Sequence, residues 1–225
     1  MKAEGKGHAE LHCRYHVQFK ARHGSHWCST YKATELKPYI DAAWCWIAEN
    51  LEDRYVHLSF ANLNGLLQNG WAPIPAFRLK GRNAKERAYV AFARLREAGI
   101  PVERLLAVHL GVNALIGDDR GSHRVQEFRI VQVAKALHRL ASGYHSEWKK
   151  DYEGRNPLNL KFDFYPKSSG IVLREIGAAV EHACAFVTDK AVPDIISKKH
   201  IMSGPHVSHL PGWKPLWQRM REGSA

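Results

Sequence analysis

The 225-residue chain has few cysteines and no long apolar run. Its four cysteines (Cys13, Cys28, Cys45 and Cys184) are scattered and form no Cys-x-x-Cys pair, which fits a protein of the reducing cytosol. No segment approaches the roughly 18 apolar residues that a membrane span needs. The first ten residues also lack the apolar stretch of a secretory signal. The sequence therefore predicts a cytoplasmic protein with no membrane partner.

The common catalytic motifs are also absent. The chain contains no P-loop, GxGxxG, HExxH or GxSxG sequence. Glu147-Trp148-Lys149 and Asp163 are residue types that metal-dependent nucleases use, but there an acid on one strand precedes the Glu-x-Lys on the next. Here Glu147 precedes Asp163, so the order is not met. We therefore expect a protein that is not an enzyme and needs no cofactor.

Negative charge is scarce. There are 22 acidic residues against 33 lysines and arginines, which gives a net charge of +11 and a pI near 9.6. The chain also contains 14 histidines. Such an excess favours polyanionic partners, with nucleic acid first and an acidic protein surface as an alternative. The content of hydrophobic residues, 45%, is ordinary for a globular protein and argues against disorder throughout.

Apolar and polar side chains alternate without a break from residue 10 to residue 20. This period of two predicts a strand with one buried and one solvated face. Arg22-His23-Gly24 suits a three-residue hairpin loop with Gly24 in the left-handed conformation, and the second strand would end near Lys32. Another alternating segment, Leu158–Tyr165, predicts a third strand that completes a small antiparallel sheet.

Six segments have the spacing of amphipathic helices. The one at 102–116 is apolar almost all round, so we expect it to be the central buried helix. Together with the strands they predict a mainly helical α+β fold, about six helices packed on a small antiparallel sheet. The domain would span residues 9–189, after a flexible lead-in (1–8) and before an irregular C-terminal arm (190–225). The expected helices are 35–49, 54–67, 83–98, 102–116, 124–141 and 169–188.

The solvated face of the N-terminal hairpin is the first candidate binding surface. It carries four basic or imidazole side chains that could lie along a phosphate backbone: His12, Arg14, His16 and Lys20. The alternative is an ordinary polar sheet face. His12 and His16 would lie about 13 Å apart at the rise of a strand, which is too far for one tetrahedral zinc ion. No metal site is predicted there.

The helix expected at 124–141 is the second candidate surface. Its cations could lie on phosphates, and its aromatic ring could stack on a splayed base. The alternative is the solvated face of an amphipathic helix. Lysines in the following segment extend the basic surface. The residues of this candidate are Arg124, Phe128, Arg129, Lys135, His138, Arg139, Lys149 and Lys150.

The C-terminal arm combines histidines with two tryptophans. His200, His206 and His209 include an HxxH spacing, but no cysteine is near and the prolines leave the geometry open, so a metal site is not expected. Trp213 and Trp217 could anchor a protein partner. The alternative is that they dock the arm on the protein's own core.

These observations favour a non-enzymatic nucleic-acid-binding protein that could have a regulatory role, using the basic helix and the hairpin on the phosphates of DNA or RNA. The first alternative is a protein-interaction module, an inhibitor or adaptor that docks through its basic surface and its Trp-containing arm. The second is a metal-dependent nuclease, which would need acidic side chains converging in a cleft.

Overall fold

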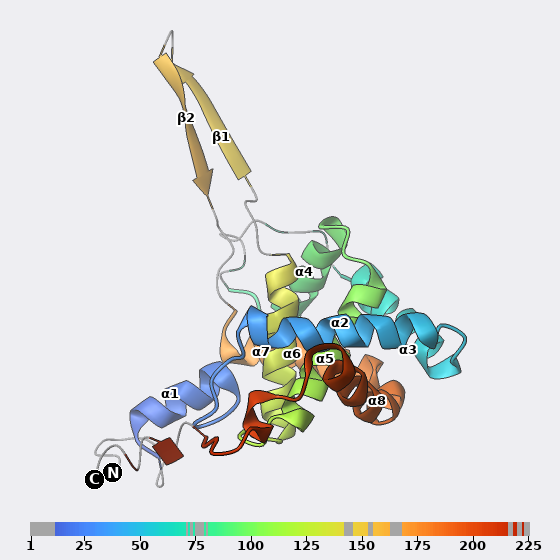
Figure 1. Cartoon of the computed structure of the whole chain (residues 1–225). Helices are drawn as coiled ribbons and strands as arrows, with labels where there is room; N and C mark the ends of the chain where they lie inside the picture. Colours follow the sequence, from blue (N-terminus) through green and yellow to red (C-terminus); the bar gives the residue numbers. More distant parts are fainter. Residues whose placement is uncertain are drawn as a thin grey trace.

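The computed structural model describes residues 12–70, 81–141, 146–152, 155–162 and 168–215, with the isolated positions 72, 74, 79, 218, 219 and 222. In 146–162 only the backbone is described. Within these ranges the chain forms eight α-helices, one pair of strands and a short 3-10 turn (Figure 1). They are α1 (Arg14–His23), α2 (Ala33–Glu49), α3 (Arg54–Gln68), α4 (Ala84–Glu97), α5 (Val102–Asp118), α6 (Gln126–Leu140), β1 (Ser146–Tyr152), β2 (Arg155–Phe162), α7 (Gly170–Ala183), α8 (Ala185–Ser203) and η2 (Val207–His209).

Helix α5 is the centre of the core. Every residue from Leu105 to Ile116 is buried, and α2, α6 and α8 pack around the helix. This agrees with a sequence that is apolar on nearly all sides, and the prediction of a central helix at 102–116 is confirmed. The buried His109 is accommodated by a contact of 2.9 Å between its Nε2 and the hydroxyl of Thr188 on α8, because a buried polar group needs a partner.

Glycine allows α2 to cross α5 closely. A Cβ built on Gly111 would lie 2.9 Å from backbone atoms of Ile40 and from its Cγ1. No side chain fits at that distance unless one of the two helices moves. The crossing therefore depends on a residue without a side chain.

The expected helices from 35 to 141 are confirmed with small changes at their ends. The cap of α4 also follows the sequence. The Asn83 side chain accepts a hydrogen bond from the amide of Glu86 at 2.9 Å, and Glu86 Oε2 accepts from the amide of Asn83 at 3.2 Å. This reciprocal pair forms a capping box, which satisfies two donors that a helix start leaves open.

The predicted N-terminal hairpin is wrong. Residues 14–23 form helix α1, in which the Tyr15 and Phe19 rings and then the Phe19 and His23 rings meet one turn apart, with centroids at 5.9 and 4.3 Å. A strand would have required its alternate apolar side chains to be buried, whereas no residue of α1 is buried. Gly24 does adopt the left-handed conformation, at φ 78°, but there it ends a helix.

The prediction of an α+β fold is also wrong, because the described core is formed by helices alone. β2 overlaps the strand expected at Leu158–Tyr165, but it pairs antiparallel with β1 and not with an N-terminal strand. In Figure 1 this pair projects away from the helices and offers no sheet for them to pack on. The folded body is therefore all-helical.

The C-terminal segment is more regular than its composition suggests. The chain expected to be irregular from residue 190 continues as α8 to Ser203, with Pro193 inside the helix. Gly204, at φ 75°, follows the last turn, and the short turn η2 then leads toward Trp213. None of the described helices is long and apolar enough to cross a membrane.

The α2–α5 crossing gives a test of the fold. We expect Gly111→Ala to lower the free energy of unfolding by about 1–2 kcal/mol, since overpacking a helix crossing outweighs the better helix propensity of alanine. Gly65→Ala on α3 is the matched control. No atom lies within 4 Å of its added Cβ, so it should stabilise by about 0.5–1 kcal/mol. Urea unfolding of both variants measures the difference, and equal effects would contradict the close crossing.

Candidate nucleic-acid interface and a buried carboxylate cluster

Six rings follow one another across the start of α1, the turn after this helix and the loop before α6. We call them the ring strip, and in spatial order they are Tyr15, His16, His12, His26, Trp27 and His123. Successive ring centroids lie 5.5, 6.2, 3.7, 6.4 and 4.4 Å apart. Five of these residues were predicted to lie on the strands of a hairpin, but the structure places them in α1 or in the segments just before and after it.

The ring strip is open to solvent at two large side chains. Tyr15 is 66% exposed and Trp27 is 48% exposed. Arg14 and Arg22 are exposed on the same helix. Lys20 Nζ pairs with Glu127 Oε2 at 3.2 Å. This surface therefore combines flat apolar faces with positive charge.

Local hydrogen bonds bring Trp27 back toward α1. The Ser25 hydroxyl accepts from the amides of Trp27 and Cys28 at 3.3 and 3.0 Å, and it lies 3.1 Å from His123 Nδ1. Ser25 therefore stabilises the turn after Gly24 and also connects it to the loop before α6. These contacts hold Trp27 and His123, the last two rings of the ring strip, in position.

Two histidines of the ring strip, His26 and His123, are held neutral. Burial and the charges of His12 and Lys20 lower the pKa of His26 below its ordinary value. Burial and the charge of Lys20 likewise lower the pKa of His123. Near neutral pH these two rings therefore offer stacking faces, and the positive charge comes from the arginines and the lysine.

The cations of the predicted α6 surface have partners within the protein, and Arg124 and Arg139 are exposed as well. Lys135 Nζ donates to the Thr30 hydroxyl at 2.6 Å, and both terminal nitrogens of Arg139 lie 3.2 Å from the Tyr31 carbonyl oxygen. Burial, with the charges of Arg139 and Arg22, lowers the pKa of Lys135 to about 8. These two cations hold the chain between α1 and α2 onto α6.

Phe128 has no exposed surface, so it cannot stack on a base in this structure. His138 Nε2 lies 2.8 Å from the Ser168 hydroxyl. Arg129 pairs with Glu181 at 2.8 Å, and Arg124 donates to the Gly117 carbonyl oxygen at 2.9 Å. The sequence identified cations here but could not show which of them have internal partners.

Arg124 and Arg129 also line a cavity of about 420 Å³ between α5, α6, α7 and α8. Asp189 and Glu181 lie on the same wall, so the charges there are mixed. Lys149 and Lys150 lie on β1, whose side chains are outside the described residues. Their predicted role stays a prediction.

The C-terminal arm docks on its own chain through Trp213. A Cβ on Gly121 would lie 2.5 Å from the Trp213 ring, so the ring packs directly on that glycine. This agrees with the alternative of a self-docked arm. Trp217 lies outside the described residues.

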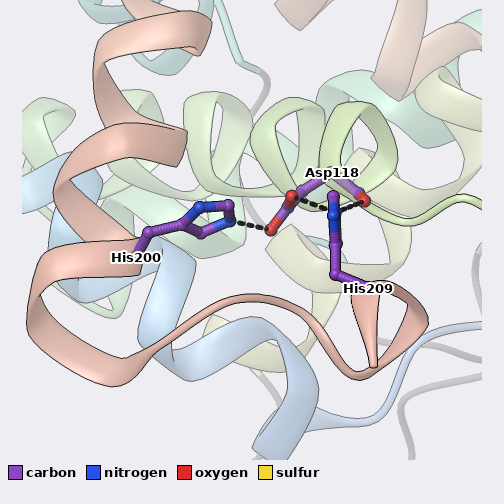
Figure 2. A group of neighbouring side chains, drawn as sticks. All are labelled: Asp118, His200 and His209. Atoms are coloured by element: carbon purple, nitrogen blue, oxygen red, sulfur yellow. Dashed lines mark hydrogen bonds and ion pairs between the residues drawn. The ribbon is translucent and has the colours of Figure 1, made fainter. Parts of the chain in front are cut away.

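The sequence missed a cluster that joins this arm to the core. Asp118, His200 and His209 converge at the end of α5 and form what we call the Asp118 cluster (Figure 2). His200 Nε2 lies 2.8 Å from Asp118 Oδ2, and His209 Nε2 lies 2.8 Å from Asp118 Oδ1. The histidines lie 82 and 91 residues from the aspartate in the chain, so no local spacing indicated the group.

Comparisons with known protein families, with curated proteins and with solved structures found no match.

Buried histidines give this structure a testable pH dependence. Burial lowers the pKa of His109 to about 3, and burial with the charge of Arg94 lowers the pKa of His138 to about 4. Both stay neutral in the folded protein down to those values, whereas in the unfolded chain they gain protons below about pH 6.5. The free energy of unfolding should therefore fall as pH drops from 6.5 to 4.

The contribution of each histidine can be separated by substitution. We expect His109→Gln to flatten this pH dependence by close to one proton, about 1.4 kcal/mol per pH unit at most. His57→Gln, at an exposed position on α3, is the control. Urea unfolding between pH 4 and 7 measures the slopes, and the same slope in both variants would contradict a neutral His109.

Proposed function

We propose that this protein binds single-stranded nucleic acid through α1 and the ring strip, without catalysing a reaction, in the cytoplasm. Bases would stack on Tyr15 and Trp27, and phosphates would meet Arg14, Arg22 and Lys20. The observation that carries the proposal is the continuous, partly exposed chain of rings beside these cations.

Charge supports a polyanionic ligand at this place. The chain has a net charge of +11, and α1 contains no acidic residue. Attraction of phosphates to such a surface supplies affinity that does not depend on sequence and that falls as salt rises. Glu127, which pairs with Lys20, is also paired with Arg174, so its charge is already balanced.

The rings favour single strands over duplex. An unpaired base exposes its face and can stack on an aromatic side chain, which stabilises by about 1–3 kcal/mol for each base. In a duplex those faces are covered by neighbouring bases. Contacts to duplex phosphates need cations, so they would not explain the exposed rings of Tyr15 and Trp27.

The proposal moves the main contact from α6 to α1. Lys135 and Arg139 contact Thr30 and Tyr31, in the segment between α1 and α2. His12, Arg14, His16 and Lys20 keep the role that the sequence suggested for them, with the last three on a helix in place of a strand. DNA and RNA are equally compatible with stacking and phosphate contacts.

Removing one ring should weaken binding without changing its salt dependence. We expect Tyr15→Ala to reduce the affinity for single-stranded oligonucleotides about ten-fold, because one base can no longer stack. Trp44→Ala is the matched control, since Trp44 is 43% exposed on α2, outside the ring strip. Fluorescence anisotropy with labelled single-stranded DNA and RNA, and with duplex DNA, gives the affinities.

Removing charge should act differently. We expect Arg14→Gln combined with Arg22→Gln to weaken binding and to reduce the slope of log K against log salt by about 0.7 for each phosphate that is no longer neutralised. Lys85→Gln, at an exposed position on α4, serves as the control for charge. Equal weakening in the control variants, or tighter binding to duplex than to single strands, would contradict the proposed interface.

A further inference from the structure

The Asp118 cluster lies apart from the ring strip and has its own chemistry. Asp118 is the last residue of α5, His200 lies in the last turn of α8, and His209 lies in η2. Figure 2 shows both imidazoles directed at the carboxylate from different elements. One nitrogen from each histidine and one carboxylate oxygen lie within 4.8 Å of one another.

This spacing fits a first-row divalent metal ion. In a tetrahedral site with bonds of about 2.0–2.1 Å, ligand atoms lie about 3.3 Å apart. The two measured nitrogen–oxygen distances of 2.8 Å are hydrogen-bond distances. An ion that binds between these groups would therefore displace the protons on the two Nε2 atoms and move the groups about half an ångström apart. Two histidines and one carboxylate are ligands that zinc readily accepts.

Hydrogen bonds hold the Asp118 carboxylate in a fixed orientation. The Tyr39 hydroxyl donates to Oδ2 at 2.6 Å and is itself buried. Partners that orient a metal-binding carboxylate in this way strengthen metal binding.

The surroundings favour a positive charge at this point. The C-terminal end of α5 carries the negative end of the helix dipole, and the Asp118 carbonyl oxygen lies 2.8 Å from His209 Nε2. The neighbouring cation, Lys199, donates to the Gly204 carbonyl oxygen and lies over the Tyr39 ring at 4.7 Å. The Lys199 ammonium group therefore interacts with the Gly204 carbonyl oxygen and the Tyr39 ring, which reduces its repulsion of a cation at Asp118.

The two imidazoles remain accessible from solvent. The Asp118 side chain is 2% exposed, whereas those of His200 and His209 are 32% and 28% exposed. An ion could therefore enter from the histidine side, and water could complete its coordination. His206 is not needed as a ligand, because its Nδ1 already contacts the Ser208 hydroxyl at 2.7 Å.

We propose that Asp118, His200 and His209 form a binding site for one zinc ion, which fastens α8 and the C-terminal arm to the end of α5. Each ligand comes from a different element, so the bound ion would tie together three parts of the chain. Binding would be independent of nucleic acid.

The test is a zinc titration of the full-length protein after removal of metals by a chelator, in competition with a chromophoric chelator. We expect one equivalent of zinc to bind to each chain. His209→Gln should weaken zinc binding at least about 100-fold, because one of three ligands is removed. Tyr39→Phe should weaken it about ten-fold, because the carboxylate is no longer oriented by the hydroxyl.

His16→Gln is the matched control, because His16 belongs to the ring strip, where histidines also lie close together. It should leave the zinc affinity unchanged, and circular dichroism confirms that each variant is folded. Failure of the wild-type protein to bind zinc would overturn the proposal. So would equal affinity in His209→Gln and wild type, or weaker binding in His16→Gln alone.

Discussion

The burial of α5 on all sides is the constraint on which the rest of the structure depends. A helix surrounded by others must satisfy its polar side chains within the protein, since water is excluded. His109 does so at its Nε2 through Thr188 on α8, and Asp118 does so through Tyr39 on α2 and the histidines of the C-terminal segment. These polar contacts offset the cost of burying His109 and Asp118, and they also fix the positions of α2, α8 and the C-terminal arm. Gly111 completes the arrangement by allowing α2 to approach.

Helices with a strong 3.6-residue period were predictable from the sequence because their apolar faces pack against α5, as in α2 and α6. The N-terminal segment was not, because an alternation of apolar and polar residues can also occur on a short helix that buries nothing. Gly24 was recognised as left-handed but could not reveal which element it ends. A local pattern predicts structure only where burial imposes that pattern, and α1 lies outside the core.

The residues of the candidate sites also differ in how well the sequence could group them. His12, Arg14, His16 and Lys20 stay together on α1 or just before it because they are neighbours in the chain, so the sequence could group them under either secondary structure. Lys135 and Arg139 on α6 contact Thr30 and Tyr31, which lie about a hundred residues earlier, so the sequence could not show these contacts. The Asp118 cluster depends on separations of 82 and 91 residues, which no local spacing can encode.

The central claim is that α1 and its ring strip are where nucleic acid contacts this protein. Ultraviolet crosslinking of a single-stranded oligonucleotide to the full-length chain, followed by peptide mapping, tests it most directly. The account predicts crosslinks within residues 12–27, at Tyr15 and Trp27 above all, with none on α4. Crosslinks confined to other segments, such as α4 or β1, would contradict it.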